Sequence, residues 1–214
     1  SSDRWGRNFY GIPPKTNGDY AWIEHMIASL KKNGRMAVVL PQGALYRMAA
    51  EGKIRKKLLE DDLLESVIGL APNLFYGTGL AASIMILNNN KPVLKKGKLL
   101  VINGSKQFWK GRAQNEMLEK HTSRILELYE AFDDVEGEST VVDMSELQEN
   151  NWNLNITRHV LPVLEEDSIT LDETVTNLKD SLKAVWKAEK RFKELLSESG
   201  HLEGFDHLLV GDSQ

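Results

Sequence analysis

The spacing of apolar residues along the chain predicts an alternation of helices and strands. Residues 1–18 are rich in Gly, Pro and Asn and show no periodicity, so we expect a loop. Apolar side chains over residues 22–30 then recur near every 3.6 positions, which predicts a helix that Asp19 can cap. Residues 36–40 form a short continuous apolar run. Such a run is typical of a strand buried on both faces of a parallel sheet.

The alternation continues through the next fifty residues. Residues 52–60 predict a second helix, and residues 63–70 and 82–87 predict two strands. A Pro-, Gly- and Asn-rich loop at residues 71–79 joins these strands, and its short length favours an antiparallel pair at one edge of the sheet. This order of elements is typical of half of a doubly wound sheet, so we predict an α/β fold with a partial doubly wound sheet.

Beyond residue 91 the pattern changes. It predicts a strand at 98–102, an amphipathic helix at about 117–132, a short strand at 141–142, a helical turn capped by Ser145, an extended segment at 151–156 and a helix over 172–199. A helix this long often packs on a partner helix, and packing on its own domain is an equal alternative. We predict one domain over residues 1–160 and an α-helical extension over residues 161–214, ending in a tail at 200–214.

Charge is divided unevenly between the two halves of the chain. The net charge of −4 by itself argues against a nucleic-acid-binding protein. Residues 1–112, however, contain 18 Lys and Arg against 8 Asp and Glu, whereas residues 113–214 contain 9 against 23. This division favours a basic face for a polyanion, joined to an acidic segment that meets another partner. Lysines that merely solvate the first half are the alternative.

Composition excludes several classes of protein. With 41% hydrophobic residues the chain can bury a core, but it has no apolar run long enough for a membrane span. The absence of cysteine excludes disulfides and thiolate metal sites, and it favours a cytoplasmic location. The five histidines show no metal-ligand spacing, so we expect no metal. The chain starts without methionine or a signal-peptide pattern, which indicates a cut end.

Three stretches in register point to a family. They are Gly18–His25, Asn33–Gly43 and Leu70–Leu80, and the later segment Asn153–Arg158 reads Asn-Leu-Asn-Ile-Thr-Arg. In this order they resemble the catalytic domain of type I restriction-modification methyltransferases of the adenine-N6 class. The resemblance implies the second half of a Rossmann-like methyltransferase domain that methylates DNA with S-adenosylmethionine. It also implies a complex with a specificity subunit, a restriction subunit and a second modification subunit.

Two motifs of that family are missing from this sequence. They are the glycine-rich turn that binds S-adenosylmethionine and the Asn-Pro-Pro-aromatic tetrapeptide that grips the target adenine. The segment Ile12-Pro13-Pro14-Lys15 lacks both the amide and the aromatic side chain, so we interpret it as a structural loop. We therefore expect a C-terminal fragment that is inactive alone. The alternatives are a non-catalytic module that docks a specificity subunit, and a methyltransferase acting on RNA or protein.

The resemblance also implies which residues form the site. It implies that Phe75, with Tyr76 and Asn73, walls the pocket for a flipped adenine, although Phe75 can equally be a core side chain beneath its loop. It implies that Asp19 and Tyr20 back the cofactor pocket, together with Pro41. For Asp19 a plain helix cap is the alternative, and for Pro41 a role in shaping the strand exit.

Basic side chains are the candidate contacts to the DNA backbone, because phosphates carry most of the affinity for DNA. The candidates are Lys53, Lys56 and Lys57 with the neighbouring Arg55, and a second group of Trp109, Lys110 and Arg112. A solvated helix face is the alternative for the first group. His25 lies next to Trp22 and Met26 on the predicted helix, which predicts a packed histidine that binds no ligand.

Overall fold

The fold was described from a computed structural model. The structure describes residues 3–161, 163 and 171–199, so the predicted tail at residues 200–214 lies outside the described residues. The chain divides into two compact units, residues 1–163 and residues 164–214.

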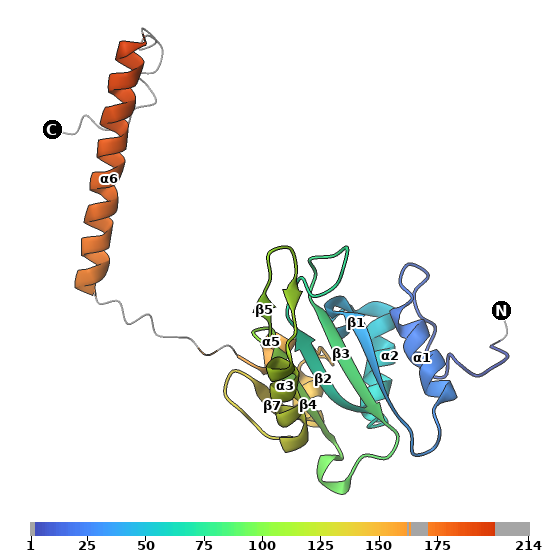
Figure 1. The fold of residues 1–214 in the computed structure, drawn as a ribbon. Coiled ribbons are helices and arrows are strands. Elements are labelled where there is room, and N and C mark those ends of the chain that lie inside the picture. The colour runs from blue at the N-terminus through green and yellow to red at the C-terminus, as the bar shows by residue number, and fades with distance from the viewer. Residues whose placement is uncertain (1–2, 162, 164–170, 200–214) are drawn as a thin grey trace. The chain divides into compact units, whose positions relative to one another are not determined.

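The first unit is built on a five-stranded sheet with the strand order β1-β3-β2-β4-β7 (Figure 1). The strands are β1 (Arg35–Pro41), β2 (Leu64–Leu70), β3 (Ala82–Asn88), β4 (Lys98–Gly104) and β7 (Ser139–Asp143). Strand β3 runs antiparallel to both β1 and β2, β4 is parallel to β2, and β7 is antiparallel to β4. The carboxyl ends of β1, β2 and β4 therefore share one edge of the sheet with the start of β3.

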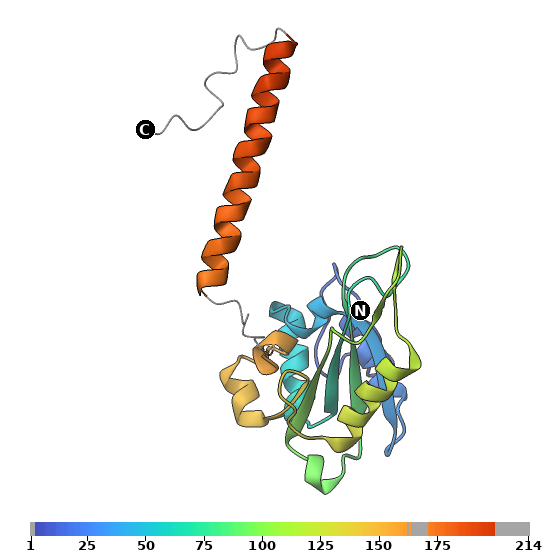
Figure 2. The same cartoon turned by 60° about the vertical axis from the view of Figure 1, so that its left-hand side comes forward.

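Helices cover both faces of this sheet, and the alternation of side chains along the strands explains why. The helices of the first unit are α1 (Asp19–Ser29), α2 (Ala49–Glu60), α3 (Glu119–Ala131), α4 (Met144–Glu149) and α5 (Ile156–His159), with short 3-10 turns η1 (Gln42–Leu45) and η2 (Val93–Lys95). Val67 packs with side chains of α1, α2, α4 and α5, whereas its neighbour Ile68 packs with Ile125 and Leu128 of α3. Figure 2 shows α2 and α3 on opposite sides of the strands. The predicted α/β architecture is confirmed.

Two predictions about the strands are wrong. Strand β1 is an edge strand whose side chains alternate in exposure; only Leu40 is buried, and Val39 is exposed. The antiparallel pair does not form an edge either, because β3 lies between β1 and β2 and β4 pairs on the far side of β2. Strand β3, which runs opposite to both neighbours, thus lies inside the sheet, where its backbone N–H and C=O groups form hydrogen bonds with β1 on one side and β2 on the other.

The helices and the later strands follow the predictions with shifted boundaries, but the prediction that Ser145 caps a helical turn is wrong, because the N-cap of α4 is Asp143 and Ser145 lies within the helix. Helix α2 begins three residues earlier than predicted, and the segment predicted to be extended at residues 151–156 is a tight turn followed by α5. A small hairpin made of β5 (Trp109–Lys110) and β6 (Asn115–Glu116) was not predicted.

The second unit contains helix α6 (Leu171–Glu198), 28 residues long, in agreement with the predicted long helix. None of its residues is buried, although its apolar side chains recur in one stripe. Among the described residues, no helix is long and apolar enough to cross a membrane.

Candidate functional site

An apolar hollow lies at the edge of the sheet where β1 ends and β3 begins. It has a volume of about 220 Å³ and is lined by Val39, Leu40, Pro41, Phe75, Thr78, Leu80, Ala81 and Ala82. Pro41 pairs directly with Ala82, so the register of β1 on β3 brings the end of β1 to the loop at residues 71–81. The ring of Phe75, 41% exposed, is therefore neither a core side chain nor free in solvent.

The other two residues predicted for this pocket lie elsewhere. Tyr76 is 94% exposed and does not line the hollow. Asn73 has a φ of +57°, a left-handed conformation that asparagine tolerates, and its Nδ2 donates a hydrogen bond to the carbonyl of Ala113 at 3.3 Å. Of the three, the structure brings only Phe75 to the hollow.

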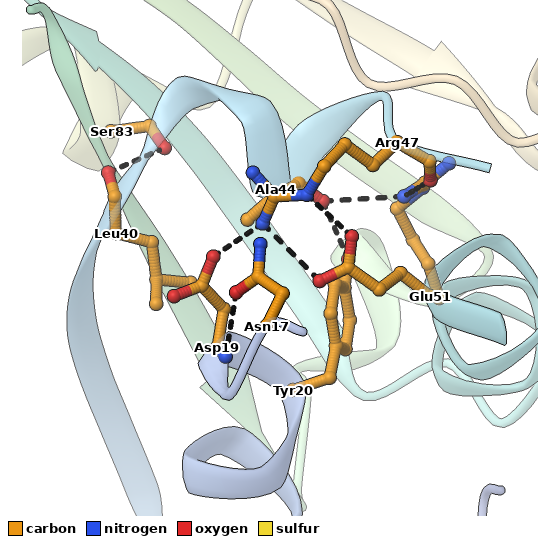
Figure 3. Close-up of polar contacts among 9 residues, drawn as sticks. Asn17, Asp19, Tyr20, Leu40, Ala44, Arg47, Glu51 and Ser83 are labelled. Carbon is orange, nitrogen blue, oxygen red and sulfur yellow. Dashed lines mark hydrogen bonds and ion pairs between the residues drawn. The ribbon is translucent and has the colours of Figure 1, made fainter. Parts of the chain in front are cut away.

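The exit from β1 is held in place by a cluster of ion pairs and hydrogen bonds (Figure 3). Arg47, just after η1, donates from Nε to Glu51 at 2.5 Å and also forms an ion pair with Asp19 at the start of α1. The hydrogen bond to Glu51 and the bond to Asp19 raise the pKa of Arg47. Asp19 does not cap its helix: the N-cap is Gly18, and no side chain caps the helix there. Its carboxylate is engaged by Arg47 instead.

Tyr20 is fully buried and supports the same turn. Its hydroxyl donates to the carbonyl of Ala44 at 2.8 Å, and burial raises the pKa of Tyr20 to about 12. Arg55 donates to the same carbonyl at 3.2 Å. Two side chains from separate helices therefore fix η1, which follows Pro41 directly (Figure 3).

The prediction that Arg55 contacts phosphates is wrong. Its guanidinium is buried and also donates to the carbonyl of Arg47 at 2.9 Å and to the carbonyl of Trp152 at 2.7 Å. A residue on the inward face of α2 cannot reach DNA, and the charged head is satisfied instead by backbone oxygens. The sequence placed Arg55 among lysines and gave no sign that it points inward.

The three lysines of α2 are exposed and line a different hollow. This hollow, of about 550 Å³, is lined by Tyr10, Gly11, Ile12, Ala49, Ala50, Lys53, Lys56, Lys57 and Glu60. It shares no lining residue with the hollow at Phe75. Lys56 is paired with Glu60 at 3.6 Å and lies 5.8 Å from the ring centroid of Trp152. The geometry keeps these lysines accessible but separates them from the Phe75 hollow.

The buried face of helix α1 is not the predicted one. Tyr20, Ile23 and Glu24 are buried, whereas Trp22 is 67% exposed. His25 is exposed with its ring edge-on to Trp22, so the expectation of a packed histidine is wrong. Because β1 is an edge strand, the face of α1 beyond it has no sheet to pack against.

The loop that carries Phe75 is fastened to the β5–β6 hairpin, a contact that sequence reasoning missed. The backbone N–H of Asn115 donates to the carbonyl of Asn73 at 2.9 Å, and its side chain donates to the carbonyl of Pro72 at 2.8 Å. Gln114 donates to the carbonyl of Leu74 at 2.6 Å. The partners lie forty or more residues apart, so no local pattern could have indicated the contact.

Comparisons with known proteins agree on a family. Residues 1–168 match the family described as N-6 DNA Methylase. The chain is 40% identical over 198 residues to the type I restriction enzyme MjaVII methylase subunit of Methanocaldococcus jannaschii, a match covering 91% of the chain and 33% of the relative. It is 31% identical to the HindI methylase subunit of Haemophilus influenzae, over 84% of the chain and 42% of the relative. The chain spans about a third of the length of the MjaVII methylase subunit and of two further methylase subunits of the same organism.

Solved structures support the same assignment. The crystal structure of a type I restriction-modification methyltransferase subunit from Streptococcus thermophilus superimposes with a TM-score of 0.70 at 38% identity, covering 75% of this chain and 34% of that one. The EcoKI M protein has the same fold, with a TM-score of 0.56 at 15% identity over 94% of this chain and 49% of that one. The chain therefore belongs to the N-6 DNA methylase family and is similar to the methylase subunits of type I restriction-modification systems.

Proposed function

We propose that the chain is part of a site-specific DNA adenine-N6 methyltransferase subunit and supplies one wall of the pocket that receives the target adenine. The observation that carries the proposal is the apolar hollow between Pro41 and Phe75, at the carboxyl edge of the sheet. Ligands of open α/β sheets bind outside the carboxyl ends of the strands. An enzyme that modifies an adenine inside a duplex must first flip the base out of the stack.

The chemistry that this wall performs is positioning. The exocyclic nitrogen of adenine is a weak nucleophile because its lone pair is delocalised into the ring. The enzyme gains rate by holding that nitrogen in line with the methyl donor. A base stacked on an aromatic ring gains about 1–3 kcal/mol. The partly exposed ring of Phe75 meets this requirement, and Tyr76 and Asn73 are proposed to act through the same loop.

S-adenosylmethionine is the proposed methyl donor, and we propose that Asp19 and Tyr20 do not contact it directly. The carboxylate of Asp19 is engaged by Arg47, and the hydroxyl of Tyr20 is engaged by Ala44. Neither group is free to bind the ribose or the amino acid part of the cofactor. We propose that Asp19, Tyr20 and Pro41 back the cofactor pocket only by fixing the exit from β1.

Substituting Phe75 in the full-length subunit tests the pocket. Phe75→Ala is expected to lower the rate of methyl transfer to duplex DNA about 10- to 100-fold, since it removes one stacking partner. Phe75→Trp keeps a flat ring and should retain most of the rate. The measurement is single-turnover incorporation of labelled methyl groups, with the urea midpoint of each variant as a folding control. An alanine variant that methylates at the parental rate would refute the proposal.

Helix α6 is the proposed docking element for a specificity subunit. Its apolar residues follow a heptad pattern through Leu171, Val175, Leu178, Leu182, Val185, Phe192 and Leu196, with Glu189 as the one polar member. Most of these side chains are exposed in the described structure, and such a stripe is typical of a helix that packs on a partner. DNA, a restriction subunit and a second modification subunit are proposed as the further partners of the complex.

A further inference from the structure

The β5–β6 hairpin and the loop that carries Phe75 lie side by side at the same edge of the sheet (Figure 1 and Figure 2). The hairpin follows β4, and β4 is parallel to β2, so both connections leave the carboxyl edge. Asn115 and Gln114 fasten the hairpin to the backbone of the Phe75 loop at residues 72–74. Asn73 returns a hydrogen bond to Ala113. These four hydrogen bonds make the two connections one structural unit.

The hairpin presents basic side chains to solvent. Lys106, Lys110 and Arg112 are exposed, and none of them forms an ion pair with any described residue. Trp109 beside them is half exposed. Between Glu65 and Glu116 the sequence contains no Asp or Glu, so the loop at residues 71–81 has no acidic side chain and Glu116, at the end of β6, is the one acidic residue of the hairpin. A surface of this kind attracts a polyanion.

The turn of the hairpin contains a close approach of the backbone at Gly111. A Cβ atom added to Gly111 would lie 2.2 Å from the carbonyl oxygen of Gln114 and 3.4 Å from the ring of Trp109. Only glycine fits in this close approach, which places Lys110 and Arg112 on either side of the turn.

We propose that the β5–β6 hairpin binds the DNA backbone beside the flipped adenine, with Lys110 and Arg112 contacting phosphates and Gln114 and Asn115 acting as positioning residues for the Phe75 loop. The proposal rests on the proposed function, since it takes the hollow at Phe75 as the adenine pocket. The proposed contact of the hairpin with DNA is separate from any contact made by α2, because the lysines of α2 line a different hollow. Backbone binding and base capture are coupled here through the hydrogen bonds between hairpin and loop.

The salt dependence of DNA binding tests the phosphate contacts. Each phosphate neutralised contributes about 0.9 to the slope of log K against log salt concentration. Lys110→Ala and Arg112→Ala, made in the full-length subunit within its complex, should each reduce this slope by about 1. Lys96→Ala is the matched control, because Lys96 is an exposed lysine at the opposite edge of the sheet and should leave the slope unchanged.

The positioning role is tested by Gln114→Met, which keeps the length of the side chain but removes the donor to the Leu74 carbonyl. Loss of one hydrogen bond should weaken base capture about two- to tenfold. The readout is the fluorescence of 2-aminopurine placed at the target adenine. The salt slope should stay parental in this variant, whereas a merely unfolded hairpin would change both measurements.

Failure of this inference can be told apart from failure of the proposed function. If the full-length subunit without substitutions neither flips nor methylates adenine, the proposed function is refuted. If the parental subunit does both, but Lys110→Ala and Arg112→Ala keep its salt slope, the hairpin does not bind DNA. Loss of complex assembly in these variants on size-exclusion chromatography would make the hairpin a protein contact, and would overturn the proposal equally.

Discussion

Glu24 is a buried carboxylate with an incomplete set of partners. One of its oxygens accepts hydrogen bonds from the backbone N–H groups of Tyr10 and Gly11, at 3.2 and 3.1 Å. The other oxygen has no partner among the described residues. Burial raises the pKa of Glu24 from 4.5 to about 7. The penalty for burying a charge therefore outweighs the two backbone donors, which by themselves favour the charged carboxylate.

This raised pKa predicts a pH dependence of stability. Between pH 4.5 and about 7 the folded chain holds a proton on Glu24 that the unfolded chain releases. The resulting stability is fully present below pH 4.5 and is lost as the pH rises through 7. Glu24→Gln should therefore flatten the fall in unfolding free energy across this window, as measured by urea unfolding at a series of pH values. The exposed carboxylate of Glu60 supplies the control, Glu60→Gln, and an unchanged pH profile for Glu24→Gln would contradict the prediction.

Glu65, near the start of the central strand β2, has a pKa that is shifted in the opposite direction. Burial acts to raise its pKa, but hydrogen bonds from Tyr129 and Asn88 and the nearby cations of Lys95 and Arg35 outweigh burial, so its pKa lies below 4.5. Its contribution to stability is present above pH 4.5 and is lost as the pH falls through the lowered pKa. The two buried glutamates thus stabilise the fold in opposite pH ranges, because side-chain donors and cations outweigh burial at Glu65, whereas burial outweighs the two backbone donors at Glu24.

Arg55 and Lys53 give a direct comparison on one helix. Arg55→Met should destabilise the chain by about 3 kcal/mol, because the carbonyl oxygens of Trp152 and Arg47 lose the guanidinium donor and that of Ala44 keeps only Tyr20. Lys53→Met should change the unfolding free energy by less than about 0.5 kcal/mol, since its side chain is exposed. Urea unfolding measures both. Equal effects for the two variants would mean that the inward orientation of Arg55 is wrong.

At the scale of elements, the stripe on α6 is the feature with the clearest consequence. An amphipathic helix without a buried face is stabilised mainly by what it packs against. The positions of its apolar residues, repeating every three or four, favour a helical partner.

Disrupting that stripe should separate the proposed complex. Leu182→Asp with Val185→Asp adds two charges to the apolar stripe, and co-purification with the specificity subunit should fall at least tenfold, because a charge buried in a helical interface is costly. Asn177→Asp with Ala184→Asp adds the same two charges on the flank of the helix and should leave the complex intact. Removing residues 165–214 should abolish co-purification. An undiminished complex in the truncated or stripe variant would refute the docking role.

At the scale of the whole molecule, the described contacts leave neither the carboxylate of Asp19 nor the hydroxyl of Tyr20 free for the methyl donor that we propose. Calorimetric titration of the 214-residue chain with S-adenosylmethionine should give no micromolar binding, because Asp19 and Tyr20 are already engaged within the protein. The full-length subunit under the same conditions is the positive control. Micromolar binding by the shorter chain would mean that it holds a complete cofactor site.

Only part of the positive charge in the first half of the chain lies on the surface. The excess of cations before residue 113 is shared between the exposed face of α2, the β5–β6 hairpin and buried or paired side chains such as Arg47 and Arg55. Only the exposed portion can attract DNA. The count of charges therefore overestimated the basic face, and the orientation of each side chain decides which cations contribute.

The sequence by itself determined the family, the alternation of helices and strands, and the length of the terminal helix. These features are encoded locally, in short motifs and in apolar residues that repeat every 3.6 positions. The family resemblance carried by the motif at Leu70–Leu80 also implied that Phe75 lies near a pocket. Residues 36–40 were correctly assigned to a strand but wrongly assigned to the interior of the sheet, since periodicity describes an element and not its neighbours.

Only the tertiary structure decided the order of the strands, the inward turn of Arg55, the pairing of Asp19 with Arg47 and the fastening of the β5–β6 hairpin to the Phe75 loop. Each of these depends on residues brought together from distant parts of the chain. A long-range contact is selected by the packing of whole elements, and a local pattern of apolar and polar residues carries no information about which distant partner is chosen.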